Sequence, residues 1–376
     1  MTKAKKTFSL FTISEARNVL FGIATLWIGL FHSDYINDAI AYLVGEGRLH
    51  NVLKFVRSSG NAGVDIFLFL SGVGLFFSFY KDSKVLSFWK KRLMRVLPTA
   101  ILIATFYFSL RYVRSKYDEG LLAYISRMTF TYFFVAGERM FWFISLILLL
   151  YLLFPLFYKA IEKWRLWGML GLIGVTLVFT FVLRAVFPVV YTNIEVALCR
   201  IPVFIIGIWA AKFIMEKREI DRRWLWLFLG IAIVSFAILY YYARIMRLFV
   251  PGYTKEMEPM YIFMYRYVCC PLGISLTVLL SFVCTELRKA GKANLLRNFF
   301  EFVGIYSMEY YMIYLNIVHY LEGKYKPEPV QCFMLYFGSF IVSLVLCVMV
   351  RKVCDIFMAY MQRKPKDAPK LQKKSS

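Results

Sequence analysis

A few ionisable side chains interrupt otherwise apolar stretches of this sequence. A charged or titratable group is costly in apolar surroundings, so each one is a candidate for chemistry. A histidine beside a carboxylate suits general base catalysis, since its unperturbed pKa is about 6.5 and the acid can fix its tautomer. His32 and Asp65 therefore predict a proton-transfer site. The interrupting groups are His32, Asp65, Arg200, Arg266, Glu309 and the hydroxyl of Tyr314.

The basic segment 81–95 is a second candidate site. Arg92 and Arg95 are three residues apart, so they share a face if the segment is helical. Guanidinium pairs bind phosphate well, which predicts an anionic, phosphate-bearing ligand. Plainer readings stay open: His32 can be interfacial, Asp65 can cap its helix, and the basic residues can serve only to fix topology. The basic residues of this segment are Lys81, Lys84, Lys90, Lys91, Arg92 and Arg95.

Long apolar blocks must position these residues. Of 376 residues, 60% are hydrophobic and 19% are aromatic, and the mean hydropathy is +0.61, which is more apolar than a soluble domain. The blocks predict an all-α polytopic membrane protein with about ten transmembrane helices, each able to cross a core of about 30 Å. The shorter segment 121–136, broken by Arg127, is expected to be interfacial or re-entrant. The helices are expected at 18–36, 63–80, 96–113, 141–158, 168–187, 197–214, 224–243, 261–284, 303–321 and 333–353.

The charge distribution predicts the orientation. Most of the 46 Lys and Arg residues fall in tails and loops that are cytoplasmic if both termini are cytoplasmic. The net charge of +23 is then mainly a topology signal, and nucleic-acid binding is not expected. We expect a cytoplasmic tail at 1–17, a membrane domain at 18–354 and a basic cytoplasmic tail at 355–376. The basic run 363–374 is expected to be solvated and to face membrane lipid.

This topology sorts the polar residues by depth. His32 lies about 22 Å along the first helix from Arg17, which puts it near the outer face. Asp65 and Arg200 enter their helices from that side, whereas Glu309 lies in the inner half. The sequence thus predicts two sites: a basic site on the cytoplasmic side, and a site with His32, Asp65 and Arg200 near the outer face. The seven cysteines show no zinc or disulfide spacing, so no metal is expected.

Six motifs in order resemble the membrane proteins of acyltransferase family 3. Residues 63–72 (GVDIFLFLSG) resemble the family element GVDIFFVLSG, and residues 200–207 (RIPVFIIG) resemble RxPxFxxG. Residues 307–314 (SMEYYMIY) are similar to SLEIYLIH. The remaining matches are residues 21–32 of the first helix, the basic loop 88–98 with its Arg-x-x-Arg pair before Pro98, and residues 142–155.

The resemblance implies a ten-helix fold in the cell membrane and transfer of an acyl group, usually acetyl. It implies cytoplasmic acyl-CoA as donor substrate, with no permanently bound cofactor. The acceptor would be a hydroxyl of an envelope or exported polysaccharide, free or lipid-linked. His32 would be the general base, with Asp65 as its catalytic partner, and Arg92 and Arg95 would hold CoA. The supporting residues would be Asp34, Trp142, Ser145, Arg200, Glu309 and Tyr314.

Two positions depart from the family pattern. Phe21 stands where the family carries an arginine, and Tyr314 stands where it carries a histidine. Arg17 lies one turn before Phe21 on the same helical face, so it is expected to take over donor binding. Two other function classes remain open: a transporter or flippase for a lipid-linked glycan or anion, and a non-catalytic family member.

Overall fold

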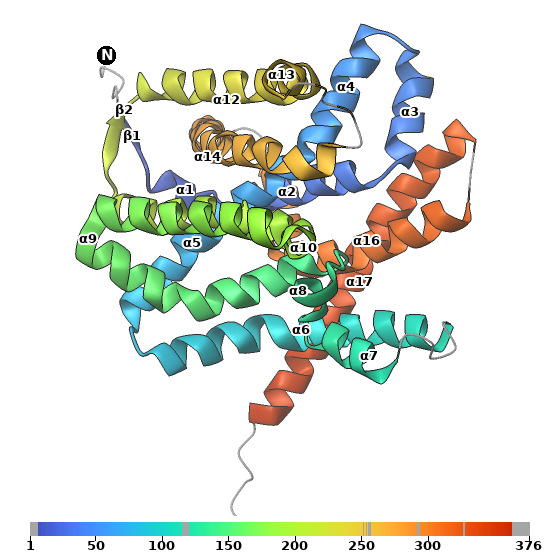
Figure 1. The fold of residues 1–376 in the computed structure, drawn as a ribbon, viewed down its shortest axis with the longest axis horizontal. Helices are drawn as coiled ribbons and strands as arrows, with labels where there is room; N and C mark the ends of the chain where they lie inside the picture. The colour runs from blue at the N-terminus through green and yellow to red at the C-terminus, as the bar shows by residue number, and fades with distance from the viewer. Residues whose placement is uncertain are drawn as a thin grey trace, which may run out of the picture.

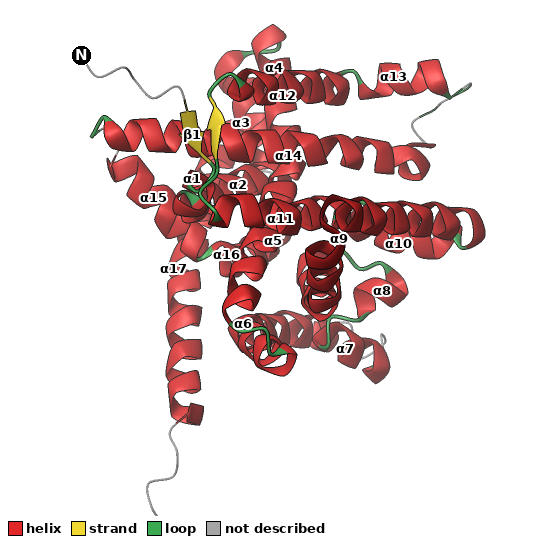
Figure 2. Cartoon of the chain, turned by 90° about the vertical axis from the view of Figure 1, so that its left-hand side faces the viewer, coloured by secondary structure: helices red, strands yellow, loops and turns green. Residues whose placement is uncertain are grey.

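A computed structural model of the chain describes residues 7–114, 120–250, 252, 254, 257–291, 294–325 and 328–362. Nearly all of this is helix, with one short pair of strands (Figure 2). The predicted all-α class is confirmed. The predicted basic run 363–374 lies outside the described residues. The elements are β1(Thr7–Ser9), α1(Thr12–Glu15), α2(Arg17–His32), α3(Tyr35–Val44), α4(Arg48–Ser58), the 3-10 helix η1(Ser59–Ala62), α5(Gly63–Lys81), α6(Val85–Arg114), α7(Leu121–Met128), α8(Tyr132–Ala136), α9(Trp142–Val186), α10(Pro188–Leu198), α11(Ile201–Met215), β2(Glu219–Asp221), α12(Trp224–Tyr240), α13(Tyr242–Phe249), α14(Glu258–Lys289), α15(Asn294–Ile305), α16(Ser307–Lys324) and α17(Pro329–Gln362).

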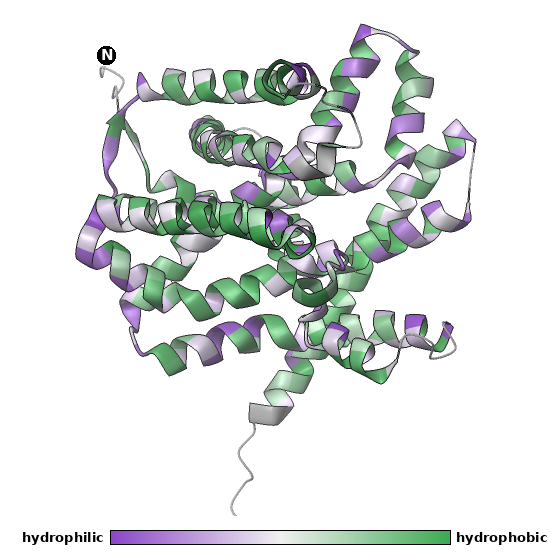
Figure 3. Cartoon of the chain, in the orientation of Figure 1, coloured by the Kyte–Doolittle hydropathy of each residue, from purple (hydrophilic) through white to green (hydrophobic). Residues whose placement is uncertain are grey.

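The structure supports a multi-pass membrane protein. Among the described residues, six helices are long and apolar enough to cross a membrane, or eight if each of two bent helix pairs forms one span. Their apolar surfaces appear in green along α9 and α12 in Figure 3, with polar residues at the α9 turn. α16 is not among them, because polar residues such as Glu309 and Glu322 interrupt it. The count of about ten crossings and the orientation of the termini remain predictions.

α9 is a hairpin of two helices and covers two predicted blocks. Its 45 residues correspond to about 68 Å, twice the thickness of a hydrocarbon core. The helix breaks at Arg165, where φ is 49° and ψ is −119°. A Cβ at Gly168 would lie only 2.4 Å from the carbonyl oxygen of Ala160. The glycine therefore allows the second arm to fold back closely against the first.

Two of the predicted inner connections lie at the same end of the molecule. β1 pairs antiparallel with β2, which ties the first described residues to the connection between α11 and α12. This strand pair and the α9 turn lie on the left of Figure 1, whereas α7 and the junction between α16 and α17 lie on the right. That arrangement is consistent with the predicted alternation of loops. We name the end at the left of Figure 1 the inner end and the end at the right the outer end, after the predicted orientation.

α2 ends in a sharp bend just after His32. The axes of α2 and α3 differ by 86°. Arg57 of α4 donates hydrogen bonds from Nε to the carbonyl oxygen of Leu30 at 2.9 Å and from Nη2 to that of Ser33 at 2.6 Å. A cation at a helix C-terminus satisfies free carbonyl groups and favours the helix dipole. The bend is thus stabilised by a residue that is distant in sequence.

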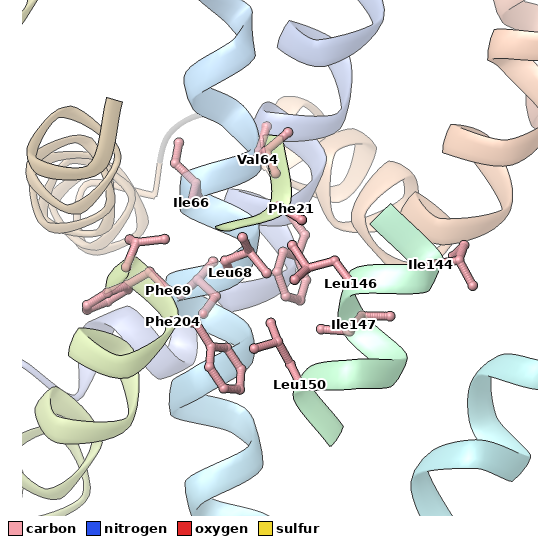
Figure 4. Packing of buried hydrophobic residues seen from close by; sticks show 14 of the residues in the cluster. Phe21, Val64, Ile66, Leu68, Phe69, Ile144, Leu146, Ile147, Leu150 and Phe204 are labelled. Atoms are coloured by element: carbon pink, nitrogen blue, oxygen red, sulfur yellow. The ribbon is translucent and has the colours of Figure 1, made fainter. Parts of the chain in front are cut away.

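Close helix contacts around α2, α5 and α11 form the core. A Cβ at Gly72 would lie 2.5 Å from the carbonyl oxygen of Phe204, and one at Gly207 would lie 2.3 Å from that of Phe69. Small residues let membrane helices approach in this way. α2 and α15 pack similarly, with Gly22 against Phe300. Figure 4 shows the ring of Phe21 beside Leu68 of α5 and Leu146 of α9.

The segment 121–136 forms two short helices, α7 and α8, rather than a span. Arg127, which interrupts it, is buried and pairs with Glu138 at 2.7 Å. α17 continues to Gln362, past the predicted end of the membrane domain at residue 354. The predicted domain limits otherwise remain predictions.

Candidate functional site

A cavity of about 1040 Å³ runs between the helix bundle's two ends. It reaches exposed residues at both: Arg95 at the inner end and His319 at the outer end. Seven of the residues that the sequence predicts for the site contribute to its wall. They are Arg17, His32, Arg92, Arg95, Trp142, Glu309 and Tyr314.

Three arginines meet at the inner end of the cavity. Arg92 and Arg95 lie on α6, which begins at Val85, so the predicted shared helical face is confirmed. Electrostatic interactions couple both to Arg17 and to the hydroxyl of Tyr151. None of the three arginines has a carboxylate partner within the described part of the chain, and the Nε atoms of Arg17 and Arg92 are buried without a hydrogen-bond partner. Such a cluster is suited to an external anion.

Aromatic and small residues hold the arginines in place. The guanidinium of Arg17 lies 4.8 Å from the ring centroid of Phe21. A Cβ at Gly74 would lie 3.3 Å from Nη2 of Arg17, so the glycine leaves room for this side chain. Arg92 lies 5.7 Å from the ring centroid of Phe88. Cation–π contacts of this kind favour a fixed guanidinium.

Asp82 anchors the start of α6 outside the membrane span. Its carboxylate accepts hydrogen bonds from Nζ of Lys91 at 2.7 Å and from the hydroxyl of Ser87 at 2.8 Å. These bonds, and a weaker one from the backbone N–H of Lys84, lower the pKa of Asp82 to about 2. An ionised carboxylate near a helix N-terminus is stabilising. Asp82 therefore helps to set the helix that carries Arg92 and Arg95.

Glu309 lies near the inner cluster but is already paired. It is buried on α16, and its carboxylate lies 3.5 Å from Nη1 of Arg351 on α17. Arg351 also donates a hydrogen bond to the carbonyl oxygen of Ile305 at 2.6 Å. Both side chains contribute to the cavity wall. This pair joins α15, α16 and α17 beside the arginines.

At the outer end, His32 faces a second histidine. The rings of His32 and His319 have centroids 6.3 Å apart and lie at 90° to each other. His319 is exposed and comes from α16, whereas His32 is partly buried at the end of α2. Tyr314 lies five residues before His319 on α16, and its ring stacks on that of Tyr310 with centroids 4.8 Å apart. The unperturbed pKa of imidazole lies near neutral pH, so both rings are candidates for proton transfer.

The structure does not bring Asp65 to His32. Asp65 is fully buried on α5, and its carboxylate lies 3.6 Å from Nε of Arg200, which is also fully buried. Arg200 donates a hydrogen bond to the side-chain oxygen of Asn61 and lies 5.2 Å from the ring centroid of Trp142. Asn61 and Trp142 both contribute to the cavity wall, whereas Asp65 and Arg200 lie behind it. The predicted His–carboxylate pair is therefore replaced by an ion pair that positions the wall.

Two further predicted residues also stand outside the cavity. The Asp34 side chain is 82% exposed and pairs with Arg57 at 2.9 Å. Ser145 is buried, and its hydroxyl donates a hydrogen bond of 2.6 Å to the carbonyl oxygen of Phe130 in the turn between α7 and α8. Both contacts fix backbone segments rather than offer a group to a ligand.

Sequence reasoning missed Glu195, a buried acidic residue behind the wall at the outer end. It is 1% exposed and pairs with Arg266 at 2.6 Å and with Arg139 at 3.0 Å. Both arginines line the cavity. The signal was available, because Glu195 precedes the apolar block at 197–214 and Arg266 interrupts another. The sequence did not show that these two residues pair across α10 and α14.

Comparison with known proteins identifies the sequence family. A family model described as an acyltransferase domain matches residues 18–352, nearly the whole chain. No curated protein and no solved structure matches the chain. The match begins inside α2, one residue after Arg17, and ends inside α17, so it covers every cavity-lining residue except Arg17.

Proposed function

The chain belongs to acyltransferase family 3, and from this membership we propose that it is a membrane O-acyltransferase acting on a glycan. The donor is cytoplasmic acyl-CoA, with acetyl as the simplest acyl group. The acceptor is a hydroxyl of a cell-surface or exported polysaccharide, free or lipid-linked. One observation carries the proposal: a single cavity connects an arginine cluster, which has no carboxylate partner among the described residues, to a histidine near the opposite end.

The arginine cluster is the proposed donor site. CoA carries several phosphate charges, and guanidinium groups bind phosphate with paired hydrogen bonds. Arg17, Arg92 and Arg95 supply three such groups at one end of the cavity. The Tyr151 hydroxyl among them is a further hydrogen-bonding group for a phosphate oxygen.

The two ends of the cavity match the shape of an acyl-CoA. Arg17 and His32 lie on one helix, 15 residues apart, which corresponds to about 22 Å. An acyl-CoA likewise separates its phosphates from its thioester by the extended pantetheine arm. With the phosphates at the arginines, the arm points along α2 towards His32. The acceptor hydroxyl then approaches the thioester from the outer end.

His32 is the proposed general base. Its imidazole accepts the proton of the acceptor hydroxyl as the oxygen attacks the thioester carbonyl carbon. The new ester C–O bond forms as the C–S bond breaks, and the imidazolium returns the proton to the departing sulfur. No acid fixes the ring among the described contacts of His32, so its orientation comes from packing beside Phe31 and His319.

The proposed function is tested by the ester content of the envelope glycans. Cells that carry the native gene, no gene, or His32→Ala are compared at equal membrane protein levels. Esterified glycan is expected only with the native protein. His50→Ala is the matched control, because His50 lies on α4 and is absent from the cavity wall. Equal ester content in all strains would contradict the proposal; reduced surface glycan with unchanged ester content would favour the transporter.

A further inference from the structure

Four aromatic rings from four helices stand in series between the two ends of the cavity. We call Phe21, Phe67, Phe143 and Tyr311 the aromatic collar. The rings of Phe21 and Phe67 stack at 4.9 Å with planes 12° apart. Phe67 meets Phe143 edge-on at 6.1 Å, and Phe143 meets Tyr311 at 5.9 Å. These residues belong to α2, α5, α9 and α16, and all four line the cavity.

The collar lies directly beyond the arginine cluster. Phe21 is one turn from Arg17, whose guanidinium contacts its ring. His32 is 11 residues further along α2, about 16 Å away. Tyr311 turns its hydroxyl out of the collar, since this group donates a hydrogen bond of 3.1 Å to the carbonyl oxygen of Met140. The surface that the four side chains offer the cavity is therefore apolar.

A cavity of this kind poses a problem in a membrane. It reaches exposed residues at both ends, Arg95 and His319. If water filled it throughout, it would be a pore, and the arginine cluster at its inner end would draw anions into it. A narrow apolar constriction prevents this, because water and ions enter it only at a high free-energy cost.

We propose that the aromatic collar is an ion seal that keeps the cavity from conducting small anions across the membrane. Figure 4 shows the ring of Phe21 between α5 and α9, near Leu68, Leu146 and Ile147. Phe21 is 8% exposed, and the rings of the other three collar residues are partly buried. The seal goes beyond acyl transfer and acts without any substrate.

The plain alternative is that the four rings only pack the helices together. Packing alone predicts that smaller side chains lower thermal stability and leave the membrane tight. A seal predicts a leak with a definite selectivity. The leak should favour chloride over potassium, because the arginine cluster lies beside the collar.

The test uses purified full-length protein in liposomes loaded with potassium chloride. Phe21→Ala combined with Phe67→Ala is compared with the native protein for chloride efflux and potassium efflux. We expect chloride efflux to rise at least about tenfold, as for a barrier lowered by about 1.4 kcal/mol, with potassium efflux unchanged. The matched control is Phe106→Ala combined with Phe179→Ala, because these rings are 71% and 50% exposed on α6 and α9.

A conservative variant separates the seal from mere packing. Phe21→Leu combined with Phe67→Leu keeps the collar apolar, so this variant is expected to remain impermeable to chloride. Native-like chloride efflux in a monodisperse alanine variant would overturn the proposal, and so would equal loss of chloride and potassium. If the double alanine variant fails to insert, Phe143→Ala is used with the same criteria. The measurement needs no acyl-CoA, so its outcome is independent of the proposed reaction.

Discussion

The two ends of the cavity handle charge in opposite ways. At the inner end, Arg17, Arg92 and Arg95 have no carboxylate partner among the described residues. At the outer end, each arginine that borders or supports the wall has an acidic partner. These pairs are Arg200 with Asp65, Arg266 and Arg139 with Glu195, and Arg57 with Asp34.

The difference indicates what each end is built to receive. An unpaired guanidinium cluster is stable only if water or an arriving anion compensates it. A wall whose arginines are already paired, around two histidines, instead suits a ligand without charge at the reacting group. The inner end therefore fits the phosphates of a donor, and the outer end fits a hydroxyl.

Removing His32 should have the largest effect, and it tests whether the outer end carries the chemistry. His32→Ala should lower the rate of acyl transfer about 10²- to 10⁴-fold, the usual contribution of a general base. Acyl-CoA affinity should stay within about twofold, because the donor site lies at the other end. Rates with purified protein and labelled acyl-CoA, together with direct binding measurements, separate the two effects. A weakened affinity with an unchanged rate would assign His32 to binding.

The buried ion pair tests whether Asp65 supports structure or chemistry. Asp65→Asn leaves Arg200 buried with no counter-charge, which should reduce the free energy of unfolding by about 3–5 kcal/mol. Thermal unfolding in detergent measures this loss. The matched control is Asp34→Asn, since the exposed pair with Arg57 should contribute at most about 1 kcal/mol. If Asp65→Asn kept full stability and lost only activity, Asp65 would be a catalytic residue as the sequence suggested.

The inner cluster can be tested while its charge is kept. Arg92→Lys combined with Arg95→Lys retains the positive charge but loses paired hydrogen bonding, so acyl-CoA affinity should fall about tenfold. Arg17→Ala should have a similar effect, since its guanidinium belongs to the same cluster. Lys84→Arg is the control, because it adds a guanidinium outside the cavity wall. Unchanged affinity in the lysine variant would mean that these arginines only fix topology.

The smallest effect is expected at Asp82, which positions the helix rather than the ligand. Asp82→Asn should leave affinity nearly unchanged and slightly lower the thermal unfolding midpoint at pH 7. Because hydrogen bonds lower the folded-state pKa of Asp82 to about 2, its contribution is present above the unfolded value of about 4. The difference between the two proteins should therefore shrink as the pH falls from about 4 to about 2. A difference that grew on acidification would contradict this account.

Local patterns in the sequence predicted a good part of this structure. The apolar blocks correspond to helices, and the three-residue spacing of Arg92 and Arg95 gives a shared face on α6. Arg17 reaches the same cluster, as its place one turn before Phe21 suggested. These features depend on residues that are near one another in the chain, where helical geometry fixes direction.

The pairing partners could not be predicted, because they depend on packing between distant helices. Asp65 meets Arg200 rather than His32, and Glu195 meets Arg266, across separations that no spacing rule covers. The bend after His32 depends in the same way on Arg57 from α4. Charged residues on opposite sides of a bundle have many possible partners, and only the arrangement of the helices selects one.

The contacts of α2 also have a consequence for biosynthesis. This helix is made long before its close neighbour α15, which begins only at Asn294. β1 likewise cannot pair until β2 has been made, since the hydroxyl of Thr7 donates a hydrogen bond to Glu219, 212 positions later. The helix that carries Arg17 and His32 must therefore stay in the membrane, incompletely covered, while most of the chain is still being made. A nascent chain stopped before residue 294 would expose one side of α2, which makes this helix a natural target for membrane quality control.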